Sequence, residues 1–193
     1  IKNQKEERNF EKVILWKYGE KFFKKLKKDN LGEAIMGFGL LFTGLDFLAS
    51  AVPNISGEHI ALFSLFRQTG IHSIIIGVIL GLVLTVFLHS SSATTAVLLT
   101  MAHTGVVGWE FSAAVILGSN VGSTVDAVLA SIGTKLNARR AAAVHVLFNV
   151  AGSVFTLAFF TPFLSLVDLI CPSSSLMTKI AVFHTLFNVI NTL

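Results

Sequence analysis

The sequence predicts an all-α membrane protein with a re-entrant helical hairpin and a broken transmembrane helix. Of its 193 residues, 53% are hydrophobic and 13% are charged, and the mean hydropathy is +0.73. A soluble domain carries about 25% charged residues, so this composition argues against an ordinary cytosolic domain. The apolar residues also form stretches of helix length. Clusters of small polar residues interrupt two of these stretches, which predicts the hairpin and the broken helix.

The charged residues are concentrated at the N-terminus. Residues 1–30 hold a net charge of +5, and the rest of the chain holds a net charge of −1. The pI of about 9.4 therefore comes from one short arm, which argues against nucleic-acid binding. Apolar residues recur in the arm at helical spacing between lysines, as in an amphipathic helix on an anionic cytoplasmic membrane surface. A solvated linker between two membrane halves is an equal alternative, and both interpretations place the arm in the cytoplasm.

Residues 31–53 form the first predicted span. Their length suffices for a hydrocarbon core about 30 Å thick, and their frequent glycines favour close contact with other helices. Asp46 lies within this span. A carboxylate at membrane depth is a candidate functional group, and a position at the membrane interface explains Asp46 equally well.

Residues 71–104 read as two apolar arms around a polar tip. The tip is His89-Ser90-Ser91-Ser92-Ala93-Thr94-Thr95. The second arm is short for a crossing, so we favour a re-entrant hairpin over two full spans. Positive residues in short loops lie on the cytoplasmic side. Both alternatives agree with this rule, because each leaves residues 1–30 and the basic loop around Lys135 on the same side.

Residues 109–133 show a second interruption. Gly118-Ser119-Asn120-Val121-Gly122-Ser123-Thr124 separates two apolar runs. A further apolar stretch covers residues 141–170, with Pro162 near its end, and residues 179–193 begin a helix that the chain does not finish. We therefore expect the sequence to be a piece of a longer protein.

Both interruptions carry hydroxyl groups and lack Lys and Arg. Irregular backbone at membrane depth must be buried in protein or line a wet cavity, where half-helix ends can face ions. Gly118 and Gly122 would let the backbone approach a ligand closely. We therefore expect an oxyanion to be held by neutral donors together with bound cations, as in a symporter. Packing of helices by small residues is the alternative.

Other polar residues are candidates outside the two interruptions. Asp126 is expected to bind sodium, with a favourable charge at a helix N-terminus as the alternative. The pairs His145/Asn149 and His184/Asn188 have helical i, i+4 spacing, and we expect hydrogen bonds between helices rather than a lining of the pathway. No carboxylate or thiolate at suitable spacing accompanies the histidines, so no transition-metal site is predicted.

These residues resemble the type II sodium-dependent phosphate cotransporter family. The family motifs are Gln-Ser-Ser-Ser-Ala-Thr-Thr at a hairpin and Gly-x-Asn-x-Gly-Thr-Thr at a break, which correspond here to residues 89–95 and 118–124. Residues 139–149 and 183–188 are also similar to the family. The resemblance covers about residues 31–193.

The resemblance implies a fold and a function for the chain. Residues 31–193 would be the second of two inverted repeats, incomplete at the C-terminus, with residues 1–30 as the linker and the first repeat missing. The protein would be a multi-pass symporter of the plasma or inner membrane that couples inward sodium movement to inorganic phosphate uptake. It would not be an enzyme and would need no cofactor besides the coupling sodium ion. Its partners would be phosphate, sodium, the lipid bilayer and the first repeat, and a homodimer is compatible with the sequence.

The resemblance also implies the site residues. Phosphate would be bound by Ser90, Ser91, Ser92, Thr94, Thr95, Gly122, Ser123 and Thr124. Sodium would be bound by His89, Ser91, Ser119, Asn120 and Asp126. Two other function classes compete with transport. One is an intramembrane serine hydrolase that uses a serine of residues 90–92 with a histidine, and the other is a structural partner subunit without transport of its own.

His89 stands where the family has glutamine. A neutral imidazole can imitate the amide, whereas a protonated one repels sodium and attracts phosphate. We therefore expect transport by the protein to fall at acidic pH more steeply than transport by a His89→Gln variant. Phosphate uptake measured across a pH series tests this, and identical profiles would remove His89 from the mechanism.

Overall fold

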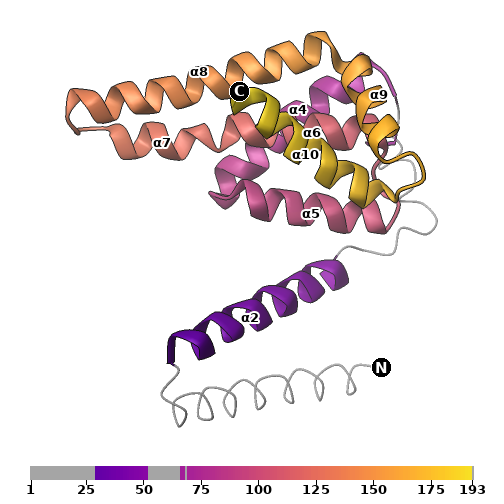
Figure 1. Cartoon of the computed structure of the whole chain (residues 1–193), viewed down its shortest axis with the longest axis horizontal. Helices are drawn as coiled ribbons and strands as arrows, with labels where there is room; N and C mark the ends of the chain where they lie inside the picture. The colour runs from indigo at the N-terminus through magenta and orange to yellow at the C-terminus, as the bar shows by residue number, and fades with distance from the viewer. Residues whose placement is uncertain (1–28, 52–65, 68, 193) are drawn as a thin grey trace. The chain divides into compact units, whose positions relative to one another are not determined.

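The computed structural model describes residues 29–51, 66–67 and 69–192, and every regular element in this part of the chain is a helix (Figure 1). The helices are α2 (Asp29–Ala51), α4 (Ile71–Leu88), α5 (Ser91–His103), α6 (Trp109–Gly122), α7 (Thr124–Ser131), α8 (Leu136–Ala158), α9 (Phe160–Ile170) and α10 (Leu176–Thr192). Within these described residues, three segments are long and apolar enough to cross a membrane, namely α4, residues 109–131 and α8. The predicted all-α membrane fold is therefore confirmed at this level.

The chain divides into two compact units, residues 1–51 and 52–193. In the first unit, α2 covers most of the predicted span 31–53, and Asp46 lies on it with an exposed side chain. Phe38 and Phe42 on α2 are exposed as well. Apart from its last two residues, the predicted arm 1–30 lies outside the described residues. Its amphipathic helix and its boundary after residue 30 stay predictions.

In the second unit, α4 and α6 cross with their backbones in contact. A Cβ atom on Gly81 would overlap the carbonyl oxygen of Val115, and one on Gly118 would overlap that of Val78. A Cβ on Gly122 would lie 2.8 Å from the carbonyl oxygen of Leu82. Four-residue spacing of glycine allows such close approach of two helices in a membrane. Gly118 and Gly122 therefore serve helix packing, and their close approach to a ligand stays a prediction.

On α4 and α8, the buried and exposed faces are reversed relative to a soluble protein. The buried residues of α4 are small or polar: Ser73, Gly77, Gly81 and Thr85. Its exposed face is large and apolar: Ile71, Ile75, Ile79, Val83 and Phe87. The same reversal occurs on α8, where Ala142, Asn149, Ser153 and Thr156 are buried. Large apolar side chains that face outward on a whole helix are suited to lipid rather than to water.

The first interruption in the sequence joins α4 to α5 in a sharp turn. His89 has a left-handed backbone with φ 49°, and Ser90 caps α5 by accepting a 3.1 Å hydrogen bond from the N–H of Ala93. Buried Thr85 and Thr94 join the two helices through their hydroxyls, 2.9 Å apart. The two arms around a polar tip are therefore present. With 18 residues, α4 is long enough for a crossing, whereas α5 has 13. That the pair is re-entrant stays a prediction.

The second interruption is much smaller than predicted. Residues 118–122 are helical and belong to α6, so that Ser123 alone separates α6 from α7. Ser123 keeps helical backbone angles, φ −63° and ψ −19°, and its N–H donates to the carbonyl of Ser119. Ser119 and Thr124 also donate their hydroxyls to carbonyls of the same chain segment. A helix break with free ends at residues 118–124 is therefore not confirmed.

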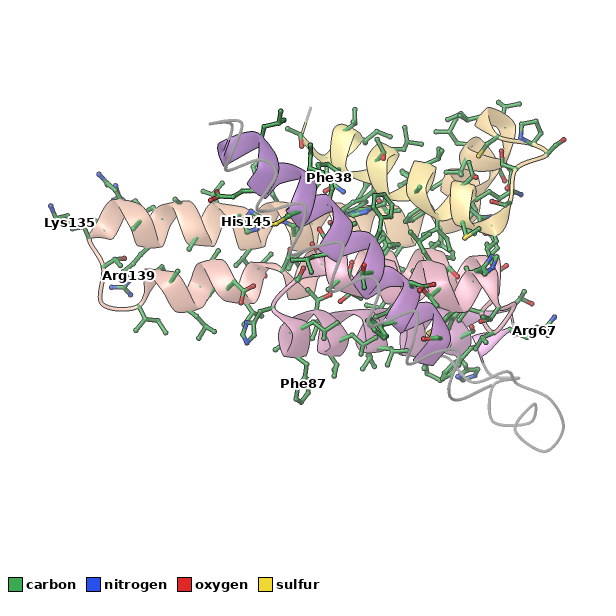
Figure 2. The ribbon with its side chains drawn as sticks, turned by 90° about the horizontal axis from the view of Figure 1, so that it is seen from below. Phe38, Arg67, Phe87, Lys135, Arg139 and His145 are labelled. Carbon is green, nitrogen blue, oxygen red and sulfur yellow. The ribbon has the colours of Figure 1, made fainter. Side chains whose placement is uncertain are left out.

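The predicted stretch 141–170 is divided between α8 and α9. Pro162 lacks an N–H to donate to Ala158, and its ring would clash with that carbonyl, so α8 ends at Ala158. At its other end α8 pairs with α7, and Lys135 and Arg139 lie at the tip of this hairpin (Figure 2). The helix α10 also packs on α6. Its Phe183 contacts Trp109 edge to face at 5.9 Å.

The backbone contact between α4 and α6 gives a stability prediction. We expect Gly118→Ala and Gly81→Ala in the full-length protein to lower the melting temperature, because relieving the overlap with a carbonyl costs about 1–3 kcal/mol. Thermal unfolding in detergent measures the effect. Gly39→Ala on α2 is the control, since a Cβ there has no heavy atom within 4 Å outside its own helix backbone. Equal melting temperatures for all three variants would contradict the crossing.

Candidate functional site

A partly open cavity of about 530 Å³ lies where the two sequence motifs meet. From the predicted set, Ser91 of the first motif and Asn120 and Ser123 of the second line this cavity. The other lining residues come from α8 and α10: Ala141, Val144, His145, Phe148, Asn149, His184, Asn188, Asn191 and Thr192. Figure 2 shows His145 on α8, well away from the hairpin tip that carries Lys135. The packing of α4 on α6 brings the start of α5 to the end of α6.

The start of α5 offers hydrogen-bond donors to the cavity. Ser90 is the N-cap, and its hydroxyl is used within the helix. Ser91 and Ser92 occupy the first two helical positions, whose N–H groups have no acceptor inside a helix. The positive end of the helix dipole adds to these donors, and a helix N-terminus of this kind suits a phosphate group. Ser91 also lines the cavity and carries a hydroxyl group.

Several predicted phosphate and sodium residues lie outside the cavity lining. Thr94 is fully buried against Thr85, and Thr95 donates its hydroxyl to the carbonyl of Ser91. Ser119 and Thr124 are also buried, with hydroxyls bonded to the carbonyls of Ile116 and Val121. The remaining predicted residues outside the lining are His89, Ser90, Ser92, Gly122 and Asp126. Most of these side chains stabilise the helices that border the cavity.

His89 and Asp126 bind each other across the two motifs. Nδ1 of His89 lies 2.7 Å from Oδ1 of Asp126, and the side chains are 62% and 44% exposed. The carboxylate can only accept, so the Nδ1–H group of His89 donates this hydrogen bond to Asp126. The contact joins the turn after α4 to the first turn of α7.

The two His/Asn pairs were interpreted incorrectly from the sequence. The amide of Asn149 donates to the carbonyl of His145 at 3.0 Å, and that of Asn188 donates to the carbonyl of His184 at 2.8 Å. Both bonds lie within one helix, and both pairs line the cavity. Asn191, which the sequence reasoning missed, lines it too. A signal was present, because positions 184, 188 and 191 have the i, i+4, i+7 spacing of one helix face.

The cavity lining mixes polar and apolar side chains and carries no formally charged residue. It contains no Lys, Arg, Asp or Glu, and its titratable groups are His145 and His184. In the described part of the chain, no three His, Cys, Asp or Glu residues gather into a metal site. The lining combines N–H and hydroxyl donors with amide and hydroxyl oxygens. Such a wall can hold an anion and a cation together.

Comparisons with known proteins agree with these features. The Na+/Pi-cotransporter family matches residues 61–169. The uncharacterized protein YqeW of Bacillus subtilis is 31% identical over 167 residues, which are 85% of this chain and 52% of YqeW. The putative inorganic phosphate export protein YjbB of Salmonella typhimurium is 28% identical over 84% of this chain and 30% of its own length.

A mammalian relative is also similar. The sodium-dependent phosphate transport protein 2A of Rattus norvegicus is 31% identical over 60% of this chain and 19% of its own length. The chain therefore spans about half the length of YqeW and less of the other two relatives. No solved structure matches the chain.

The contact between His89 and Asp126 gives a test of whether the two motifs meet. We expect His89→Cys and Asp126→Cys, combined in full-length protein without other reactive thiols, to be joined by a short bifunctional thiol reagent. Mass spectrometry of the digested protein detects the linked peptides. The control pair is His103→Cys with Asp126→Cys, because His103 ends α5 at the opposite side from its capped start. Equal linking of both pairs would contradict the arrangement.

Proposed function

Because this chain belongs to the Na+/Pi-cotransporter family, we propose that the protein containing it is a secondary transporter that couples sodium movement to the transport of inorganic phosphate. The observation that carries the proposal is the neutral cavity in which Ser91, Asn120 and Ser123 come together. The family match and the apolar helices also support a multi-pass protein of the cell membrane.

In this proposal the phosphate binds at the start of α5. The free N–H groups of Ser91 and Ser92 and the Ser91 hydroxyl donate to the phosphate oxygens. Ser90 caps the helix, and Thr94 and Thr95 hold the turn in place. Ser123 approaches from α6 on the opposite wall, with Gly122 and Thr124 beside it. Fixed dipoles of this kind stabilise an oxyanion without a full positive charge nearby.

The absence of charged groups from the lining supports coupling to a cation. A phosphate ion in a neutral cavity is costly unless a counterion enters with it. Sodium bound near Asn120, Ser91 and Ser119 supplies that charge, and the paired His89 and Asp126 border the same region. Each sodium charge that moves inward gains about 2.3 kcal/mol per 100 mV of membrane potential. Phosphate that moves with sodium is accumulated at the expense of this gradient.

The proposed membrane arrangement follows the same reasoning. The α4–α5 pair acts as a re-entrant hairpin whose tip carries Ser91 to the cavity, and Ser123 is the point at which α6 gives way to α7. The open side of the cavity is completed by an inverted first repeat of the same protein, and two copies of the protein can form a homodimer. Residues 1–30 form a cytoplasmic linker, on the same side as the basic α7–α8 loop.

Export of phosphate is a second candidate, favoured by the name of the YjbB relative. The cavity geometry is the same for both directions. A hydrolase gains no support, because no serine hydroxyl in the described residues is hydrogen-bonded to a histidine ring.

Phosphate transport by the full-length protein tests the proposal. In vesicles with an inward sodium gradient, we expect uptake of radioactive phosphate that disappears when potassium replaces sodium. Ser91→Ala and Asn120→Ala should reduce initial uptake at low phosphate about tenfold or more, since hydrogen bonds to charged groups contribute about 1.5–3 kcal/mol.

Ser165→Ala on α9 is the matched control, because its hydroxyl bonds to the carbonyl of Thr161 and lies outside the cavity lining. Normal uptake in the Ser91 and Asn120 variants would refute the site. Vesicles loaded with phosphate and kept free of sodium on both sides identify the alternative, since a sodium-independent exporter releases the phosphate and a sodium symporter retains it.

A further inference from the structure

Three asparagines of the cavity share one side-chain arrangement. The amide nitrogens of Asn120, Asn149 and Asn188 each donate to the carbonyl four residues earlier in the same helix, at 2.9, 3.0 and 2.8 Å. They come from three different helices, α6, α8 and α10, and all three line the cavity. Residues 145–149 and 184–188 even share the sequence His-x-Leu-Phe-Asn.

This arrangement fixes the orientation of each amide. A backbone carbonyl can only accept a hydrogen bond, so the group that faces it must be the NH2 and not the oxygen. The Oδ1 atom then points away from the helix backbone. None of the three Oδ1 atoms accepts a hydrogen bond from a described residue.

The free oxygens of Asn120 and Asn149 reach open space although both residues are buried, at 5% and 8% exposure. In the described chain, the polar side-chain atoms that are fully buried without a partner are those of Ser73 and Trp109. The Asn120 and Asn149 oxygens are therefore not sealed in the protein, and the space that both residues border is the cavity.

The neighbouring hydroxyl adds a further oxygen to this wall. Ser123 donates its proton to the carbonyl of Asn120 at 2.8 Å, which leaves its lone pairs unused. The α6, α8 and α10 side of the cavity thus presents oxygen acceptors, while the start of α5 presents N–H donors. Neutral carbonyl and hydroxyl oxygens are ligands that hard cations accept in place of water.

We propose that Oδ1 of Asn120, Asn149 and Asn188, with Oγ of Ser123, bind the sodium ion that enters the cavity. The proposal rests on the proposed function for the identity of the cation. It adds Asn149 and Asn188 as ligands and assigns the α8 and α10 walls to sodium. Amide oxygens suit a shared cavity, because a carboxylate would bind sodium more strongly but would repel phosphate.

Sodium-dependent thermal stability tests this assignment without transport. Purified full-length protein in detergent is melted over a sodium chloride series, with choline chloride added to keep ionic strength constant and no phosphate present. We expect sodium to raise the melting temperature of the unchanged protein. Asn149→Ala and Asn188→Ala should each need about tenfold more sodium for half of this rise, since one lost ligand to an ion is comparable to one charged hydrogen bond.

Asn137→Ala is the matched control, because Asn137 lies on α8 with Asn149, is exposed and does not line the cavity. Ser91→Ala should shift a separate phosphate titration, because Ser91 donates to the phosphate in the proposed function. If an alanine variant fails to fold, Asn149→Ser or Asn188→Ser, which keep an oxygen, should give an intermediate midpoint.

The outcomes separate this proposal from the proposed function. Unchanged sodium midpoints in the Asn149 and Asn188 variants overturn the sodium assignment, and a shift of their phosphate midpoints instead assigns the amides to phosphate. The sodium assignment is also overturned if sodium does not raise the melting temperature of the unchanged protein. If the Asn149 and Asn188 variants need more sodium for half of the rise in melting temperature, but the unchanged protein moves no phosphate, the cation site is supported and the transport function is refuted.

Discussion

The contact of α4 with α6 through glycine is the constraint on which the rest of this unit depends. Gly81 and Gly118 leave no room for a side chain, so the two backbones touch. The contacting residues advance together along both helices, which shows that α4 and α6 run in the same direction. Their C-terminal ends therefore lie together. The turn after α4 then delivers the start of α5 to the end of α6, and Ser91 meets Asn120 and Ser123 across one cavity.

The sequence was sufficient for the fold class, because the apolar stretches and the turn at residues 89–90 depend on local patterns. It was insufficient for the second interruption. Gly118 and Gly122 signal a helix break and close helix packing equally well, and only the position of α4 decides between them. The same ambiguity affects hydroxyl residues, since Thr94 was predicted to contact a ligand and instead joins α4 to α5.

The candidate site was predicted in part for a related reason. Ser91, Asn120 and Ser123 belong to short motifs that can be recognised along the chain. Asn149 and Asn188 lie on helices that reach the cavity only through tertiary packing, so their spacing alone led to the preference for hydrogen bonds between helices over a place in the lining. The detail that distinguishes them is the bond from each amide to its own helix, which cannot be read from spacing.

The backbone contact between α4 and α6 also limits how the cavity can open. Gly81 and Gly118 each lie against a carbonyl group of the other helix, and this contact exists in one register only. If α4 slid by one residue along α6, a side chain next to Gly81 would take the place of the glycine and clash with α6. We therefore expect α4 and α6 to move together as a single rigid body. If the protein transports phosphate as proposed, its alternating-access cycle would be accommodated at the borders of that body, where α8 and α10 meet it through smaller contact surfaces.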